Sequence, residues 1–437
     1  MTGTIELPIW LFVVIVLFAA VTFASHFLFP SVRWFFRRRL ERAVARLNAR
    51  LTVKIQPFKL LRRQDMIQRL LYDPQVTEAI VAYAAKEGVR EDVAFEKARR
   101  YAREIVPSFS AFTYFGFGTR AARWLATALY DVRIQGDAAL ADIPEDATVV
   151  FVMNHRSNMD YVLVTYLAAR ASALSYAVGE WAQVWPLSRF IKMMGAYFIR
   201  RKARGALYLK VLARYVHLST AGGVTQAIFP EGGLSLDGRL APPKMGLLSY
   251  VLEAHRDTGK AIVFVPVAIN YDRVLEDRVL TEAGAAGTRK FRASIRSIIG
   301  FVLSKLWLRL RGRFERFGVA AVTFGAPMPL DGHVDAEALA QDLLGQIAAS
   351  MPVTGVPLVA RHLSVEDAVS EAALKKAAGP AADITAALRV MEGRGLIQRA
   401  DGQVSAAPGA DQLLTYYANA AGRDFADAAQ NAAPARS

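Results

Sequence analysis

The chain begins with an uninterrupted apolar stretch. Residues 8–29 are almost wholly apolar, and no charged residue lies between Glu6 and Arg33. About 20 such residues suffice to cross a bilayer as a helix. A signal peptide would carry basic residues before the apolar stretch, whereas here an acid precedes it and arginines follow it. The positive-inside rule then predicts a transmembrane anchor over residues 1–32, with the body of the protein on the cytoplasmic face. A buried core helix is the alternative.

Residues 33–130 change to a helical pattern. Apolar positions recur at helical spacing in 73–85 and 92–105, among Ala, Glu, Lys and Arg residues that favour helices. Asp73 directly before Pro74 suits a helix start, because Pro is tolerated in the first turn. We therefore expect a helical, membrane-proximal region over 33–130.

From about residue 131, short apolar runs alternate with helical stretches such as 160–171. These runs are typical of β-strands at 132–136, 147–153, 225–230, 261–269 and 317–325. Strands that alternate with helices indicate an α/β architecture, here a mixed sheet flanked by helices. The predicted α/β domain spans residues 131–330.

Helical patterns return after the predicted sheet. Residues 334–350 and 364–420 look helical, which predicts a C-terminal helical region over 331–423. The last residues, 424–437, are rich in Ala and are expected to form a disordered tail.

The distribution of charge favours a membrane as the anionic partner. The net charge is +15, of which residues 1–60 carry +7 and residues 289–316 carry +8, so the rest of the chain is neutral. In the second segment basic residues surround apolar ones at helical spacing, the pattern of a helix lying in the membrane interface. An amphipathic helix packed on the core is the alternative. Nucleic acid is disfavoured, because the basic residues flank apolar runs rather than a recognition fold.

Composition and motifs narrow the chemistry. The chain has no Cys, which excludes disulfides, thiolate metal sites and Cys nucleophiles. It also lacks a Gly-rich phosphate loop of Walker or Rossmann spacing.

The first chemical cluster is NHRSNMD (154–160), directly after a strand of buried type. The strand end places His155 at the sheet edge, where sites of α/β proteins lie. Asp160, one turn into the next helix, can face back toward His155 and fix its tautomer, which leaves the other ring nitrogen free to take a proton from a hydroxyl. The alternative is that Ser157 and Asp160 merely cap the helix.

Three further clusters follow other predicted elements. Arg200 and Arg201 end the segment GAYFIRR, where paired guanidinium groups either bind phosphate or form a solvated basic turn. Glu231 and Gly232 belong to FPEGG, which is either a ligand-binding loop or a tight turn. VPVAINYD (265–272) is typical of a core strand.

In this order and spacing, the four clusters resemble the four blocks of the glycerophospholipid acyltransferase family. The blocks correspond to NHRSNMD, GAYFIRR, FPEGG and VPVAINYD. Three further segments look like the glycerol-3-phosphate acyltransferase branch: KARRYAREI (97–105), YDRVLE (271–276) and GRGLIQRADGQV…LLTYYAN (393–419). The resemblance covers most of residues 90–420.

The resemblance implies acyl transfer from acyl-CoA or acyl-carrier protein to a glycerol phosphate hydroxyl, with no cofactor and no metal. His155 would be the general base and Asp160 its orienting partner. Substrate-binding positions would be Arg156, Arg200, Arg201, Glu231, Gly232, Ser235 and Arg239. The expected partners are a phospholipid membrane, the acyl donor and the acceptor.

One block departs from the family pattern. The family's third block continues with arginines around its serine, but here Leu234 and Leu236 flank Ser235, while Arg239 falls on the final basic position. This departure leaves three acceptors open: glycerol 3-phosphate, its 1-acyl product or another hydroxylated lipid precursor. A non-catalytic basic membrane-binding protein is the alternative from another class.

Overall fold

The computed structural model describes residues 8–19, 63–171, 173–179, 183, 187–200, 205–287, 300, 307, 311, 316–332, 335–380 and 382–421. The chain separates into two compact units, Met1–Lys54 and Ile55–Ser437.

In the first unit, residues 9–19 form a helix whose large apolar side chains are exposed, with Ile9 83% and Phe18 74% exposed. The remainder of the predicted span 8–29 lies outside the described residues. Among the helices in the described ranges, none is both long and apolar enough to cross a bilayer. The transmembrane anchor and the boundaries of the predicted domains therefore stay predictions.

The described part of the second unit begins with five helices, of which α3 and α4 confirm the helices predicted at 73–85 and 92–105. They are α2 (Arg63–Leu71), α3 (Pro74–Glu87), α4 (Glu91–Ile105), the π-helix η2 (Phe112–Gly118) and α5 (Thr119–Leu129). The Asp73 side chain caps α3 by accepting a hydrogen bond from the Gln75 amide, and Gly88 ends this helix in a left-handed conformation. The arginine-rich residues 37–50 lie outside the described part of the chain.

The centre of the second unit is a mixed eight-stranded sheet, which confirms the predicted α/β class. Its strands are β1 (Asp131–Gln135), β2 (Thr148–Met153), β3 (Ser175–Gly179), β4 (Ala196–Ile199), β5 (Gln226–Ile228), β6 (Ile262–Tyr271), β7 (Val319–Phe324) and β8 (Met328–Pro329). The order is β1-β7-β6-β2-β5-β3-β4, and β8 pairs with β6. Strands β6, β2, β5, β3 and β4 are parallel to one another, so their carboxyl ends share one edge.

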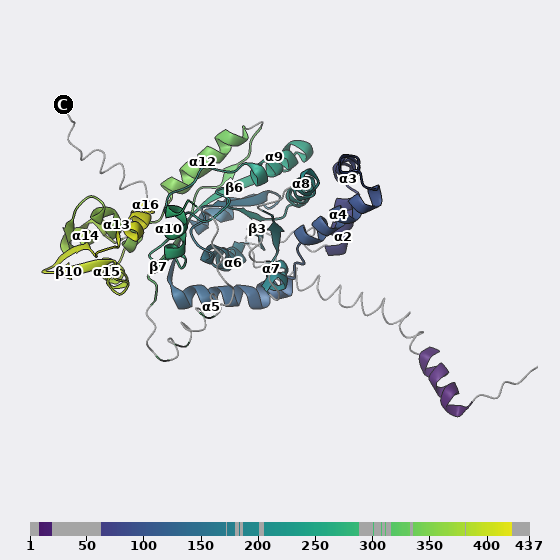
Figure 1. The fold of residues 1–437 in the computed structure, drawn as a ribbon, viewed down its shortest axis with the longest axis horizontal. Helices are drawn as coiled ribbons and strands as arrows, with labels where there is room; N and C mark the ends of the chain where they lie inside the picture. The colour runs from purple at the N-terminus through teal and green to yellow at the C-terminus, as the bar shows by residue number, and fades with distance from the viewer. Residues whose placement is uncertain are drawn as a thin grey trace, which may run out of the picture. The chain divides into compact units, whose positions relative to one another are not determined.

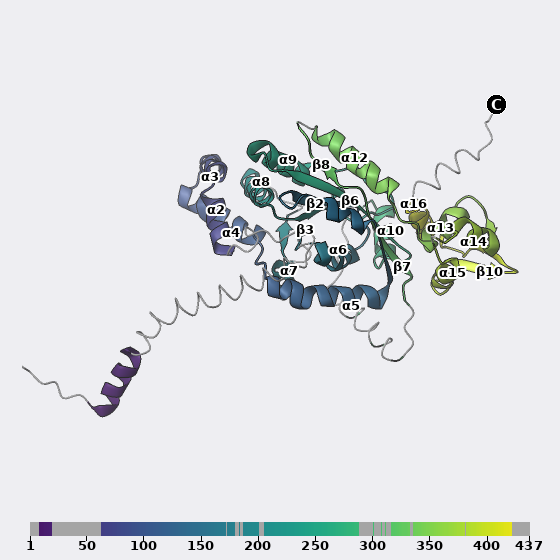
Figure 2. The same cartoon turned by 180° about the vertical axis from the view of Figure 1, so that it is seen from behind.

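Helices cover both faces of this sheet (Figures 1 and 2). On one face lie α8 (Ala206–Ala221), α9 (Gly246–Thr258) and α12 (Ala336–Ala349); on the other lie α5 and α6 (Met159–Ala171). Shorter elements are η3 (Asp137–Asp142), α7 (Leu187–Met193) and α10 (Asp277–Ala285). Every residue of β2 and β6 is buried, because both lie in the middle of the sheet under these helices.

The C-terminal region corrects the expectation of an all-helical segment. It contains α13 (Gly355–Leu363), β9 (Ala368–Ser370), α14 (Glu371–Ala378), α15 (Ile384–Glu392), β10 (Ile397–Ala400), β11 (Gln403–Ala406) and α16 (Asp411–Asn419). The three strands form an antiparallel sheet of order β10-β11-β9. Asp401 and Gly402, both with positive φ, make the two-residue turn between β10 and β11.

Two predicted segments lie wholly or mostly outside the described residues. The amphipathic segment 289–316 is described only at single positions, and the predicted tail 424–437 is not described at all.

Candidate active site

The first cluster, NHRSNMD (154–160), follows the carboxyl end of β2 and therefore lies at the edge of the sheet. Asn154 joins this end to β6: its Nδ2 donates to the Ile269 carbonyl at 2.9 Å, and its Oδ1 accepts from the Ile269 amide at 2.7 Å. Asn154 is fully buried, and both of these side-chain groups are satisfied. The chain therefore leaves the sheet at His155 in a fixed direction.

His155 and Asp160 are in direct contact. Nδ1 of His155 lies 2.8 Å from Oδ2 of Asp160, and the two side chains are 3% and 0% exposed. Oδ2 also accepts hydrogen bonds from the amides of Arg156 at 2.7 Å and Ser157 at 3.0 Å. Helix capping and the contact with histidine thus occur together, on one carboxylate oxygen. Because Nδ1 is engaged, Nε2 is the nitrogen of His155 that can accept a proton from a substrate.

The second oxygen of Asp160 is bonded by a residue from another strand. The hydroxyl of Tyr271, the last residue of β6, donates to Oδ1 at 2.5 Å. Burial raises the pKa of Tyr271 well above its ordinary value, and the Asp160 charge raises it further, so this hydroxyl stays a donor. Asp160 is therefore held through both carboxylate oxygens.

The His155 ring is enclosed by aromatic side chains and anchored through its backbone. It packs against Phe229, with ring centroids 4.3 Å apart, and against Tyr161 at 5.3 Å. The His155 amide donates to Glu231 Oε1 at 2.8 Å. This packing leaves the imidazole little freedom to rotate.

Glu231 links two loops rather than pointing at solvent. Its Oε2 accepts from the Ala241 amide at 2.9 Å, so each carboxylate oxygen holds a backbone amide. Burial raises the pKa of Glu231, and these amide hydrogen bonds oppose the rise. Next to it, Gly232 has a φ of +66°, and an added Cβ would lie 2.8 Å from Lys244 Cδ.

The loop after Glu231 returns to His155. The Ser235 amide donates to the His155 carbonyl at 3.0 Å, and the Ser235 hydroxyl donates to the Arg239 carbonyl at 2.7 Å. Arg239 itself is exposed. Ser235 therefore orders the loop, in which Arg239 presents a positive charge to solvent and Asp237 a negative one.

Arg156 is a buried cation beside the histidine. The residue is 3% exposed, and its Nη1 donates to the Gly238 carbonyl. Its Nε is buried and has no hydrogen-bond partner among the described residues. A buried guanidinium nitrogen in this state is a candidate to bind a further acceptor group, such as a phosphate oxygen or a water molecule.

A carboxylate beyond β6 holds the other side of the first cluster. Glu276 Oε2 accepts from the Ser157 hydroxyl at 2.7 Å, and Oε1 accepts from the side chain of Asn158 at 3.0 Å. Burial raises the pKa of Glu276, and these two hydrogen bonds oppose the rise. The segment from His155 to Asp160 is thus fixed between Glu231 and Glu276.

Arg200 lies at the same sheet edge but does not contact His155. Three strand spacings, about 14 Å, separate the ends of β2 and β4. Its guanidinium makes a bidentate pair with Glu104 of α4, at 2.9 and 2.6 Å, and lies over the rings of Tyr101 and Tyr208. The Glu104 hydrogen bonds raise the pKa of Arg200. Arg201 lies outside the described residues.

The two leucines that replace family arginines are packed. Leu234 is 6% exposed, and Leu236 lies against Gly284 of α10, with its carbonyl oxygen 3.2 Å from the position of a Cβ there. These positions therefore contribute apolar packing to the loop and carry no charge.

Sequence reasoning missed four residues that position the site: Glu104, Phe229, Tyr271 and Glu276. Each lies inside a quoted segment, since Glu104 belongs to KARRYAREI, Phe229 to FPEGG, and Tyr271 and Glu276 to YDRVLE. The family resemblance therefore included these residues, but their contacts join positions up to 119 residues apart and cannot be predicted from the spacing of a motif.

Comparison with known proteins relates this part of the chain to a family. The profile of the Acyltransferase family matches residues 133–270, which include β2 to β5, most of β1 and β6, the first three blocks and most of the fourth. Residues 133–270 are therefore an acyltransferase domain.

The chain is also similar to curated proteins of one branch of this family. Two proteins named glycerol-3-phosphate acyltransferase, from Pseudomonas paraeruginosa and Ectopseudomonas mendocina, are 32% identical to this chain over 307 and 278 residues, or 68% and 62% of it. Over these residues the chain is similar to the glycerol-3-phosphate acyltransferase branch of the family. It spans only about a third of the length of these relatives, 36% and 32%. A solved 1-acyl-sn-glycerophosphate acyltransferase, PlsC from Thermotoga maritima, aligns with 54% of this chain and 75% of its own, at 20% identity and a TM-score of 0.34.

Proposed function

We propose that this protein transfers a fatty acyl group from acyl-CoA or acyl-carrier protein to a hydroxyl of glycerol 3-phosphate, giving lysophosphatidate for phospholipid synthesis. The observation that carries the proposal is the buried His155–Asp160 contact of 2.8 Å at the carboxyl edge of the sheet. No cofactor is needed for this chemistry.

In the proposed reaction, Nε2 of His155 removes the proton of the acceptor hydroxyl as its oxygen attacks the thioester carbonyl carbon. The tetrahedral intermediate then expels the donor thiolate, which takes the proton from Nε2, so an ester forms as the thioester breaks. Asp160 holds the ring through Nδ1 and stabilises the imidazolium that exists between the two proton transfers.

Cationic side chains at the sheet edge supply the phosphate-binding groups of the proposal. Arg156 is buried beside His155 and has an unpartnered Nε among the described residues, and Arg239 is exposed on the adjacent loop. Arg200, oriented by Glu104, extends the cationic positions along the edge, and Arg201, the next residue in the sequence, is proposed to add a further cation. Glu231, Gly232 and Ser235 shape the loop that the acceptor would contact.

Acylation of 1-acylglycerol 3-phosphate is the second candidate. The observation in its favour is the packed Leu234 and Leu236, which make the third block less cationic than the family pattern. Competition between the two acceptors separates these functions, since a clear preference for glycerol 3-phosphate refutes the second.

The proposed location is a membrane, with a single span and the acyltransferase domain on the cytoplasmic face. The exposed apolar helix of residues 9–19 and the basic segments support this placement.

The test is turnover by the purified protein with an acyl donor and glycerol 3-phosphate. We expect His155→Ala to lower kcat by about 10² to 10⁴-fold, because general-base catalysis has this magnitude. A loss below about tenfold contradicts the role of His155. Vesicle binding without turnover under any donor would favour a non-catalytic membrane-binding protein.

A further inference from the structure

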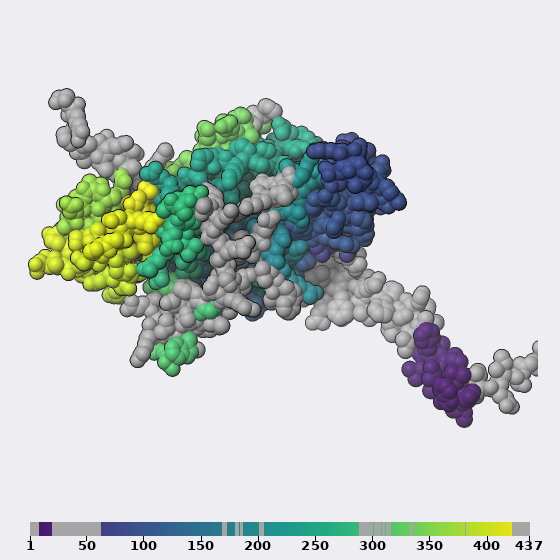
Figure 3. Space-filling view, in the orientation of Figure 1, coloured from purple at the N-terminus to yellow at the C-terminus, as the bar shows by residue number. Residues whose placement is uncertain are grey.

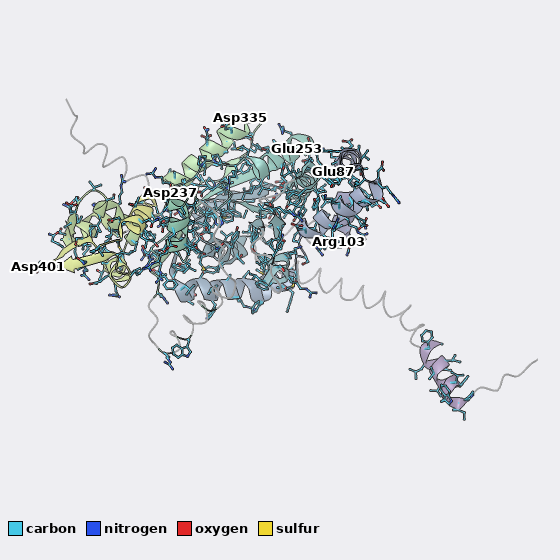
Figure 4. All side chains as sticks on the ribbon, viewed as in Figure 1. Glu87, Arg103, Asp237, Glu253, Asp335 and Asp401 are labelled. Atoms are coloured by element: carbon cyan, nitrogen blue, oxygen red, sulfur yellow. The ribbon has the colours of Figure 1, made fainter. Side chains whose placement is uncertain are left out.

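The last described helix, α16, contacts two loops of the candidate active site. Asn419 Nδ2 donates to the Asp237 carbonyl at 2.8 Å, across 182 positions of the chain. The Tyr417 hydroxyl donates to Asp277 Oδ2 at 2.5 Å and accepts from the Val274 amide at 3.0 Å. Figure 3 shows this yellow C-terminal region directly against the green and teal surface, and Figure 4 labels Asp237 on that side.

The contact between α16 and the loop after Glu231 is too close for any side chain. Gly238 has a φ of +84°, and a Cβ there would lie 1.9 Å from the Tyr416 carbonyl oxygen. The loop backbone therefore rests on the helix backbone, and a displacement of the helix must displace the loop.

From this loop, two hydrogen bonds lead to the histidine segment. The Gly238 carbonyl accepts from Arg156 Nη1, and the Ser235 amide donates to the His155 carbonyl at 3.0 Å. Asp237 Oδ1 accepts from the Arg239 amide at 3.0 Å and thereby orders the exposed arginine. Asn419 thus bonds the loop that orders Arg156 and Arg239, two of the predicted substrate-binding residues.

The second loop leads to the other side of the same segment. Arg394 donates to Asp277 Oδ2, the oxygen that Tyr417 also bonds, so two C-terminal side chains hold the start of α10. Glu276, the residue before Asp277, holds Ser157 and Asn158. Tyr417 is therefore linked, through Asp277 and the adjacent Glu276, to the segment that carries His155 and Asp160.

We propose that α16 is a clamp that positions the active site from the C-terminal region. Asn419 positions the acceptor-binding cations Arg156 and Arg239, and Tyr417 positions the His155–Asp160 segment. This inference rests on the proposed acyl transfer for its kinetic readouts. It assigns a role to the segment LLTYYAN, whose residues lie about 260 positions from the catalytic histidine.

The contacts made by Asn419 and by Tyr417 predict different kinetic effects. Asn419→Ala should raise KM for glycerol 3-phosphate by about tenfold, the worth of one hydrogen bond, with kcat and the donor KM changed less than about twofold. Tyr417→Phe keeps the ring packing but loses the hydroxyl, and should lower kcat by about tenfold with little effect on the acceptor KM. Thr415→Ala, an exposed substitution on the same helix, is the matched control and should leave all three constants unchanged.

Hydrogen exchange provides a readout that needs no substrate. Asn419→Ala should speed exchange of the Ser235 and Arg239 amides, while exchange in α8 stays as in the wild type. Wild-type protein without turnover would refute the proposed function, and the exchange result would still decide whether α16 holds the loop.

Two results overturn the clamp. One is that Asn419→Ala and Tyr417→Phe match Thr415→Ala in kinetics and exchange. The other is that both variants lower thermal stability and all kinetic constants together, because a general packing role would not separate KM from kcat. If Asn419→Ala fails to fold, the isosteric Asn419→Asp, which removes the same donor, replaces it.

Discussion

At the scale of single residues, the site depends on one carboxylate. Asp160 accepts three hydrogen bonds on Oδ2 and one on Oδ1. The Oδ2 bonds come from its own segment, whereas the Oδ1 bond from Tyr271 comes from β6. Tyr271 is thus the residue that ties the orientation of the dyad to the sheet.

We expect Tyr271→Phe to lower kcat by about tenfold while leaving both substrate KM values within about twofold. The substitution removes a buried hydrogen bond to an ionised group, a contact usually worth about 1.5–3 kcal/mol, but keeps the ring. Steady-state kinetics with the acyl donor and glycerol 3-phosphate measure the effect.

Tyr130→Phe is the matched control for this prediction. Tyr130 is also buried, packs on Tyr271 with ring centroids 5.5 Å apart, and donates its hydroxyl to the Arg273 carbonyl at 2.7 Å. Equal losses of kcat in the two variants would show that Tyr271 serves packing rather than the orientation of Asp160.

The sequence predicted the contact between His155 and Asp160 because the two residues lie five positions apart around the start of α6, where local geometry decides the contact. Sequence reasoning took VPVAINYD for a core strand, which is correct for β6, and overlooked Tyr271 at its end. The contact between Tyr271 and Asp160 depends on the pairing of β2 with β6, for example Val152 beside Pro266. Register between distant strands is not encoded in the spacing of a motif.

At the scale of secondary-structure elements, long periodic segments were predicted and short strands were missed. Strands β9, β10 and β11 have three or four residues each, and only Val369, Ile397 and Val404 among them are buried. So few alternating positions do not separate a strand from a helix. The Asp401-Gly402 dipeptide was the available hairpin signal.

Asp272 joins three elements immediately after β6. Its Oδ2 accepts from the Val319 amide of β7 at 2.7 Å, and its Oδ1 accepts from the Val356 amide in the first turn of α13 at 2.8 Å. Burial raises the pKa of Asp272 to about 6, and the Val356 and Val319 amides oppose the rise. The junction between the sheet and the C-terminal region therefore contains a titratable group.

The raised pKa predicts how this junction responds to pH. Because the folded pKa exceeds the ordinary value of 3.8, the folded state binds the proton more tightly, and this group stabilises folding most below about pH 4. The contribution declines as pH rises through about 6, by at most about 3 kcal/mol.

Urea unfolding of the wild type and Asp272→Asn at several pH values between about 4 and 7 measures this contribution. The variant cannot ionise at this position, so the wild type should lose stability relative to it as pH rises. A raised pKa would be contradicted if the stability of the wild type relative to the variant stayed constant or increased with pH.

At the scale of the whole molecule, the net positive charge lies in two segments, and exposed apolar side chains lie on the helix of residues 9–19. Residues 1–60 carry +7 and residues 289–316 carry +8, so the remaining chain, including the dyad, is neutral. The helix of residues 9–19 exposes apolar side chains, as a helix meant for an apolar surrounding would. These observations lead us to propose two modes of membrane attachment, an apolar span and a charged contact, which an experiment can tell apart.

We expect the full chain to stay with membranes in alkaline carbonate and in high salt, because an apolar span does not depend on charge. A variant lacking residues 1–32 should be released by carbonate yet still bind anionic vesicles at low ionic strength through its basic segments, 33–59 and 289–316. That binding should vanish near 1 M salt, where the screening length falls to about 3 Å. Sedimentation with vesicles of anionic and of neutral lipid measures both steps.

The control for the second step neutralises Arg309, Arg311 and Arg313 to Gln in the shortened variant. This change should weaken vesicle binding at low salt, with the basic residues of 33–59 still present, while leaving turnover in detergent intact. Carbonate release of the full chain would contradict the span over 8–29. Carbonate resistance of the shortened variant would mean that another segment enters the bilayer, and equal binding to neutral and anionic vesicles would mean that apolar side chains, rather than the basic residues of 33–59 and 289–316, make the second contact.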